Sequence, residues 1–283
     1  MSVREVSLKQ ITKVVSDMVI DANYNLPDDV RDALEKMHKE EESDLCKSII
    51  EDIIKNANIA RDKQKPICQD TGMAVFFVEL GQDVHLVDGS LQEAFDEGVR
   101  DGYKRGYLRK GTQEYAVGER VNRGDNTPAI VHVEIVPGDK VKITACPKGF
   151  GSENMSKLAM LTPSVGWEGV KKFIIDTVRD AGPNPCPPII VGVGIGGTME
   201  VVAYNAKKAL IRKTNERSKD PKIALLEEEL LEEINKLGIG AQGFGGTRTA
   251  LAVHIISHPT HIAGMAVCVN INCHVARHKT VII

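Results

Sequence analysis

Three of the six cysteines in this sequence lie in polar loops beside predicted strands, where a scaffold can hold a reactive side chain in place. Cys68 opens the run Cys68-Gln69-Asp70-Thr71-Gly72, which sets a thiol, an amide, a carboxylate and a hydroxyl before an apolar segment. Cys186 lies in a proline-rich break, and Cys273 follows a predicted strand. An ordinary turn with a core cysteine would explain Cys68 alone, so the chemistry rests on all three thiols together.

The long separations between these cysteines match no compact zinc motif. Three loop thiolates without a fourth fit an iron–sulfur cubane with one open iron, which can act as a Lewis acid. A non-catalytic zinc or iron–sulfur scaffold is the alternative. The other cysteines look structural: Cys46 falls on a helical pattern, Cys268 within a strand and Cys146 at the end of one.

Composition excludes several classes of protein. The 283 residues suffice for one large or two modest domains, and 42% hydrophobic with 27% charged residues is ordinary for a globular protein. A net charge of −3 and 4% aromatic residues argue against nucleic-acid binding. We find no signal-peptide pattern and no apolar run long enough to span a membrane. We therefore expect a cytoplasmic chain with reduced thiols.

The hydrophobic patterns predict an α/β (mixed α+β) fold in a single domain 1–283. Its N-terminal part, over about 1–62, is expected to be helical, and the part over about 63–283 is expected to form mixed sheet layers flanked by helices. Expected helices lie within 6–60 and at 91–107, 165–181, 198–212 and 222–237, and a further helix opens near Ser152, its expected cap. Expected strands lie at 73–78, 129–136, 140–145, 189–193, 250–256 and 263–271. The turn Pro137-Gly138-Asp139 predicts a hairpin, and the apolar end 280–283 predicts cover from outside the chain or a short disordered tail.

The run Gly192-Val193-Gly194-Ile195-Gly196-Gly197 fits the dinucleotide fingerprint between a strand and a helix. The second strand with an acidic end, expected about 20 residues later, is missing. Close packing is therefore favoured over a dinucleotide site, and an NAD-dependent oxidoreductase is kept as an alternative.

Six motifs occur in one order along the chain, and together they are far more specific than any one of them. They are Ile67-Cys68-Gln69-Asp70-Thr71-Gly72, Gly124-Asp125-Asn126-Thr127-Pro128, Lys148-Gly149-Phe150-Gly151-Ser152-Glu153-Asn154, Cys186-Pro187-Pro188 with the glycine run 192–197 and Thr198, His258-Pro259-Thr260-His261, and Asn272-Cys273. Over nearly its whole length the chain resembles the alpha subunit of the two-subunit class I (iron–sulfur) fumarate hydratase and L(+)-tartrate dehydratase family.

That resemblance implies a [4Fe-4S] cluster held by Cys68, Cys186 and Cys273, with one iron open to the hydroxyl and a carboxylate of a 2-hydroxy diacid. It implies that Asp70 and His261 are catalytic and act together on the proton of the substrate hydroxyl. The residues expected to contact the substrate are Gln69, Asp70, Arg109, Gly151 and Asn154. Arginine can pair both oxygens of a carboxylate, and Gly151 and Asn154 are expected to bind an anion as a loop amide and a helix start.

Other readings of these side chains stay open. Arg109 could be a solvated loop charge, and His261 could cap a strand. His254 and His258 are expected to be structural, whereas His274 and His278 could tune the last ligand. Lys148, Lys157 and Arg248 are further candidates without a rank.

The resemblance further implies reversible hydration of fumarate to (S)-malate by a chain that is incomplete without a beta subunit, in a heterotetramer built on an alpha–alpha dimer. L(+)-tartrate and mesaconate are alternative substrates, because they differ from this pair by only a hydroxyl or a methyl group.

Overall fold

A computed structural model describes residues 3–283 and confirms the mixed α/β class. The chain divides into two compact units. Unit 1 comprises the residues up to Pro27 together with Asn56–Phe150 and Arg277–Ile283, and unit 2 comprises Asp28–Lys55 and Gly151–Ala276. Single-domain organisation over 1–283 stays a prediction, and each unit is described by itself.

The main sheet of unit 1 has the strand order β10-β5-β2-β4. β2 (Val75–Gly81) runs parallel to β4 (Ile130–Val136) and antiparallel to β5 (Val141–Ala145), and β10 (Lys279–Ile282) pairs antiparallel with β5. A separate parallel pair joins β1 (Arg4–Ser7) to β3 (Val84–Val87).

Two predictions for this sheet are wrong. β4 and β5 do not form a hairpin, because β2 lies between them in the sheet. The 137–139 turn crosses the C-terminal end of β2, where the Gly81 N–H donates to Lys140 O and the Gln82 N–H donates to Val136 O. The C-terminal residues do not form a disordered tail, since β10 pairs with β5 and Val281 and Ile283 pack against the core of unit 1. Ile282 is 63% exposed, so cover from outside the chain stays a prediction.

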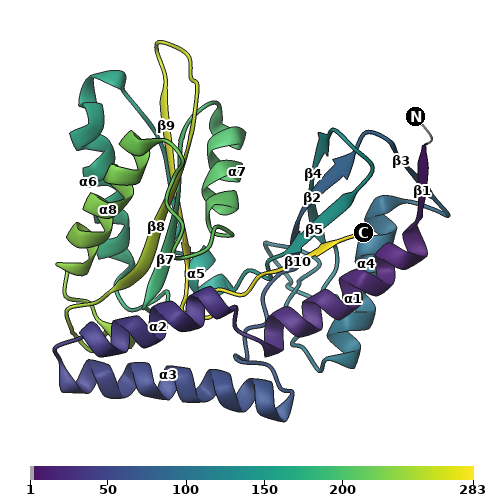
Figure 1. Cartoon of the computed structure of the whole chain (residues 1–283), viewed down its shortest axis with the longest axis horizontal. Coiled ribbons are helices and arrows are strands. Elements are labelled where there is room, and N and C mark those ends of the chain that lie inside the picture. Colours follow the sequence, from purple (N-terminus) through teal and green to yellow (C-terminus); the bar gives the residue numbers. More distant parts are fainter. Residues whose placement is uncertain (1–2) are drawn as a thin grey trace. The chain divides into compact units, whose positions relative to one another are not determined.

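Two helices cover this sheet, α1 (Leu8–Tyr24) and α4 (Leu91–Arg105), and they lie side by side (Figure 1). They pack closely because α4 presents glycines to α1. A Cβ on Gly102 would lie 2.3 Å from Val19 Cγ2, and one on Gly98 would lie 2.7 Å from Val15. The core that they share with the sheet includes Tyr103 of α4, which is fully buried.

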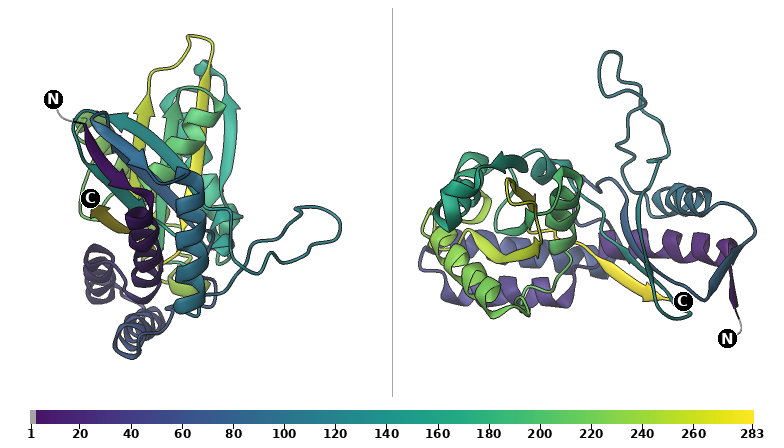
Figure 2. Two further views of the ribbon diagram at one scale, coloured as in Figure 1. Left: turned by 90° about the vertical axis from the view of Figure 1, so that its right-hand side faces the viewer. Right: turned by 90° about the horizontal axis from the view of Figure 1, so that it is seen from above.

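Unit 2 is a three-layer structure (Figures 1 and 2). Its sheet has the order β6-β9-β7-β8, formed by β6 (Lys157–Leu161), β7 (Ile189–Gly196), β8 (Ala250–His258) and β9 (Met265–Asn272). Helices α6 (Gly166–Ala181) and α8 (Pro221–Asn235) share one core with the sheet, and α7 (Met199–Ala209) packs on the other face. Also in the chain are α2 (Asp28–Glu40), α3 (Asp44–Lys63, which begins in unit 2), the single-turn α5 (Phe150–Glu153), and the 3₁₀ turns Pro163–Val165 and Ala241–Gly243.

The glycine run 192–197 permits close packing, as predicted. A Cβ on Gly194 would lie 2.1 Å from Val202 O, and one on Gly192 would lie 2.3 Å from Ala206 O, both in α7. The glycines therefore let α7 lie directly on β7, which explains the run without a dinucleotide.

No helix within residues 3–283 is both long enough and apolar enough to cross a membrane.

Candidate functional site

In unit 1, the Cys68 loop holds its carboxylate in a fixed orientation. Asp70 Oδ1 accepts the Gly72 N–H at 3.0 Å and Oδ2 accepts the Phe150 N–H at 2.8 Å. The Asp70 N–H donates to Cys68 Sγ at 3.4 Å, and the Cys68 thiol donates to Gln69 Oε1 at 3.5 Å. Gln69 is exposed, whereas Cys68 and Asp70 are half-buried. Thiol, amide and carboxylate are thus presented together at the surface of unit 1.

The neighbouring elements of unit 1 fix this loop through its main chain. The buried Tyr103 hydroxyl lies 3.0 Å from Thr71 O and 2.9 Å from Gly72 O. The Thr71 hydroxyl donates to Arg109 O at 2.9 Å. Arg109 therefore lies directly beside the loop, and it is an exposed residue whose guanidinium can bind an anion.

A buried arginine next to this loop escaped the sequence reasoning. Arg277 is 2% exposed; its Nη1 donates to Asn23 Oδ1 at 2.8 Å, and its Nε has no hydrogen-bond partner. A Cβ on Gly149 would lie 3.3 Å from Arg277 Nη2 and 3.2 Å from Asp70 Oδ2, so the two charged groups flank one glycine. The pKa of the Tyr103 hydroxyl is raised, mainly by burial. The charge of Arg277 lowers this pKa and that of Asp70 raises it. A buried guanidinium is costly without an anion nearby, and Asp70 is the carboxylate on the other side of Gly149.

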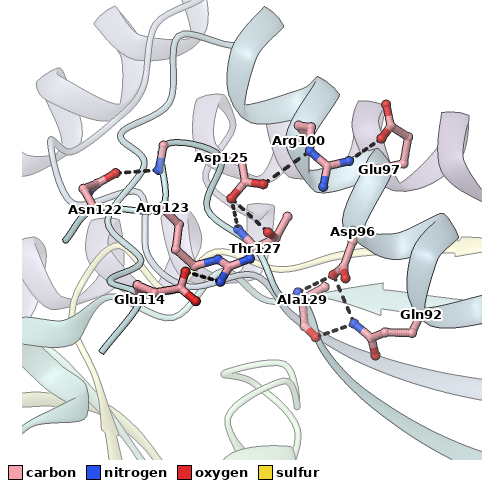
Figure 3. A network of polar contacts seen from close by, with 11 residues as sticks. Gln92, Asp96, Glu97, Arg100, Glu114, Asn122, Arg123, Asp125, Thr127 and Ala129 are labelled. Atoms are coloured by element: carbon pink, nitrogen blue, oxygen red, sulfur yellow. Dashed lines mark hydrogen bonds and ion pairs between the residues drawn. The ribbon is translucent and has the colours of Figure 1, made fainter. Parts of the chain in front are cut away.

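The motif 124–128 forms the base of the long segment 107–128, which extends away from the body of unit 1 (Figure 2). Figure 3 shows Asp125 accepting from the N–H and hydroxyl of Thr127 and from Arg100 of α4. Burial opposes ionisation of Asp125, but these hydrogen bonds outweigh it and lower its pKa. The buried Asn126 donates to Gly72 O at 3.2 Å and accepts the Gly111 N–H at 2.8 Å. The motif thereby ties this segment to the Cys68 loop.

In unit 2, the loops that carry Cys186 and Cys273 meet. The His274 N–H donates to Cys186 O at 3.4 Å, and His274 Nδ1 lies 3.0 Å from the same oxygen. Cys186 is exposed and has φ 54°, in the left-handed region that favours glycine. A cysteine kept in this conformation points to a requirement for its thiol. The structure thus brings into contact the two loops that carry Cys186 and Cys273, two of the three predicted ligands.

Gly151 and Asn154 occupy different places around α5. Gly151 lies next to the Cys186 turn, since a Cβ on it would be 3.6 Å from Asn184 O. Asn154 follows the last residue of the four-residue α5, so the helix-start argument for it was wrong. Ser152 likewise lies inside this turn and does not cap it. The roles of Gly151 and Asn154 in substrate binding stay predictions.

His261 lies at the other end of the unit 2 sheet. It follows the end of β8, in the β8–β9 connection at the top of Figure 1, whereas Cys186 precedes β7 and Cys273 follows β9. Since β7 runs from Ile189 to Gly196, at about 3.3 Å per residue its ends are roughly 23 Å apart. The exposed His261 lines a shallow pocket of about 300 Å³ with residues such as Thr198. Within unit 2 it is remote from both thiols.

The remaining cysteines and histidines are largely where they were expected. Cys46 lies on α3 and Cys268 on β9, and both are buried; burial raises the pKa of Cys268 to about 11. Cys146 follows the end of β5. His254 is a core residue with no exposed surface. Taken separately, neither unit gathers three or more His, Cys, Asp or Glu residues of the described chain into a self-contained metal site.

Comparison with known proteins agrees with these motifs. Residues 12–282 match the family described as fumarate hydratase (Fumerase). A protein of Methanocaldococcus jannaschii, provisionally named as an L(+)-tartrate dehydratase subunit alpha, is 43% identical over 93% of this chain and 94% of its own length. The L(+)-tartrate dehydratase subunit alpha of Escherichia coli O157:H7 is 34% identical over 99% of this chain and 93% of its own. The protein is therefore a subunit of a hydro-lyase. More narrowly, it belongs to the fumarate hydratase (Fumerase) family.

Proposed function

We propose that this chain is the alpha subunit of a [4Fe-4S]-dependent hydro-lyase that interconverts fumarate and (S)-malate in the cytoplasm. The observation that carries the proposal is the hydrogen-bonded meeting of the Cys186 and Cys273 loops. L(+)-tartrate is the second candidate substrate, favoured by the names of the relatives.

The donor set fits an iron–sulfur cluster. Cys68, Cys186 and Cys273 all lie in loops and are half-buried or exposed residues, and cysteine thiolates are the usual ligands of iron–sulfur clusters. The family match supports Cys68 as the third ligand, because it covers residues 12–282 and so includes all three loop cysteines. When bound, the cluster would supply Lewis-acid assistance to loss of the substrate hydroxyl.

The residues of the chain itself would bind and orient the diacid. Arg109 would pair a substrate carboxylate through two nitrogens, and Gln69 with the Gly151 amide and Asn154 would donate further hydrogen bonds. Asp70, oriented by Gly72 and Phe150, would accept a proton at its carboxylate.

The place of His261 in this scheme requires a second copy of the chain. A histidine roughly 23 Å from the Cys186 end of its own unit cannot share a substrate bound there. We therefore propose that His261 serves the site of the other alpha subunit in an alpha–alpha dimer. With the beta subunit implied by the names of the relatives, this gives a heterotetramer.

The experiment is an anaerobic assay of the reconstituted chain with fumarate and with L(+)-tartrate, in the presence and absence of the beta chain. We expect turnover only with the partner. Full fumarate hydration by this chain alone would refute the partner requirement. Asp70→Asn should abolish turnover while the cluster is kept, and the exposed Asp139→Asn should not affect it. Full activity of Asp70→Asn would contradict a catalytic role for Asp70, and absence of turnover in the wild-type pair with its cluster intact would favour a non-catalytic scaffold.

A further inference from the structure

We propose that Gln242 is a positioning residue that holds the Cys186 loop against the Cys273 loop. This inference rests on the proposed function insofar as it concerns two of the three thiols assigned to the cluster. Gln242 belongs to the glycine-rich segment 238–246, to which neither the motifs nor the proposed reaction gives a role.

Gln242 contacts both cysteine loops. Its main-chain N–H donates to Pro187 O at 2.8 Å, and its side-chain Nε2 donates to the same oxygen at 2.9 Å. Nε2 also lies 3.2 Å from His274 Nδ1, which in turn lies 3.0 Å from Cys186 O. If His274 Nδ1 carries the proton, it can donate to Cys186 O, and if it does not, it can accept from Gln242 Nε2. Gln242 thus donates hydrogen bonds to Pro187, which follows Cys186, and contacts His274, which follows Cys273.

The backbone of Gln242 indicates that this side chain is required. Its φ is 54°, in the left-handed region where glycine is preferred and other residues are strained by about 1–2 kcal/mol. The flanking loop fits closely around the turn that leads to Cys186, since a Cβ on Gly243 would lie 2.3 Å from Pro183 Cβ. The loop therefore contacts residues on both sides of Cys186, at Pro183 and at Pro187.

The segment that carries Gln242 is itself anchored to the rest of unit 2. The Ala241 N–H donates to the buried Cys46 thiol at 3.3 Å. The Glu41 carboxylate accepts the N–H groups of Thr247 at 2.9 Å and Arg248 at 3.0 Å. Because these anchors lie in α3 and at the end of α2, Gln242 is held by the scaffold of the unit.

Two variants at this position separate positioning from packing. Gln242→Ala removes the side-chain bonds, and Gln242→Glu keeps the size while replacing the donor by an acceptor that faces Pro187 O. The first readout is hydrogen exchange of the Cys186 and His274 amides in the cluster-free chain. We expect exchange to be roughly fivefold faster in both variants, as for the loss of about one net hydrogen bond. The exposed Gln82→Ala serves as the control and should match wild type.

The second readout is the rate at which a chelator removes iron from the anaerobically reconstituted chain, followed by absorbance. We expect faster loss from both variants. Unchanged amide exchange, or wild-type exchange in Gln242→Glu, would overturn the inference. Faster amide exchange in the variants together with a wild-type rate of iron loss would also overturn the inference. If wild type assembles no cluster, the proposed function fails, and amide exchange alone then decides on Gln242.

Discussion

The buried carboxylate of Glu41 offers a sharp test of how unit 2 is held together. Glu41 is 2% exposed and accepts hydrogen bonds from the N–H groups of Glu42, Ser43, Thr247 and Arg248, and from the Thr247 hydroxyl. The perturbation is Glu41→Gln. It removes the negative charge and turns an amide group toward donors that need an acceptor.

The magnitude follows from the pKa of Glu41. Burial alone would raise this pKa, but the donors from Ser43, Thr247 and Glu42 outweigh it and lower the pKa from 4.5 to about 2. At about 1.4 kcal/mol per pH unit, the ionised form contributes about 3 kcal/mol to the free energy of unfolding. Because the folded pKa is depressed, this contribution is complete above pH 4.5 and is lost as the pH falls toward 2.

The assay is denaturant unfolding of the cluster-free chain under reducing conditions, followed by fluorescence. The only tryptophan, Trp167, lies in α6 and reports on unit 2. We expect Glu41→Gln to lose about 3 kcal/mol at pH 7 and to lack the decline between pH 4.5 and 2. The control is Glu40→Gln, whose partly exposed ion pair with Arg248 is worth less than about 1 kcal/mol. Loss of less than about 1 kcal/mol in Glu41→Gln would refute the reasoning.

Three further predictions concern single residues. Burial, with nearby Arg212, lowers the pKa of His254 to about 3, so the free energy of unfolding should fall by up to about 5 kcal/mol as the pH drops from 6.5 toward 3. His254→Leu should flatten this pH dependence in denaturant unfolding, and an unchanged slope in that variant would contradict the prediction. Gly194→Ala should lower the unfolding midpoint of unit 2 by more than Gly264→Ala, because a Cβ at 194 would lie 2.1 Å from Val202 O in α7, whereas one at 264 would make only ordinary contacts at 3.6 Å or more. Mixing His261→Ala and Cys186→Ser alpha chains should restore about a quarter of the activity if His261 acts across a dimer, and a mixture that stays inactive would argue against it.

Much of the fold followed from local patterns. The helices α4, α6, α7 and α8 and the buried β7 were predicted within a few residues, because their apolar spacing and Gly/Pro boundaries are local features. The short strands β1, β3, β6 and β10 were missed, since strands of four or five residues gain their pairing from distant segments. The hairpin failed for the same reason: a turn signal does not reveal that β2 inserts between its arms.

The loop positions of Cys68, Asp70 and Cys186 were predictable, because each lies in a motif rich in polar or helix-breaking residues. The residues that contact these loops were not predictable. Arg277 and Gln242 reach their partners only through tertiary contacts, and each reads in sequence as an ordinary surface residue. A signal was nevertheless present for Gln242, since five glycines surround it between 238 and 246.

The central claim is that Cys68, Cys186 and Cys273 together hold the cluster. It is tested most directly by iron and sulfide analysis with electron paramagnetic resonance on anaerobically reconstituted single cysteine-to-serine variants. We expect the composition of a [4Fe-4S] cluster in wild type and Cys146→Ser, and its loss when any of the three loop cysteines is replaced. A cluster retained in Cys186→Ser and Cys273→Ser, or one that depends equally on Cys146, would contradict the assignment.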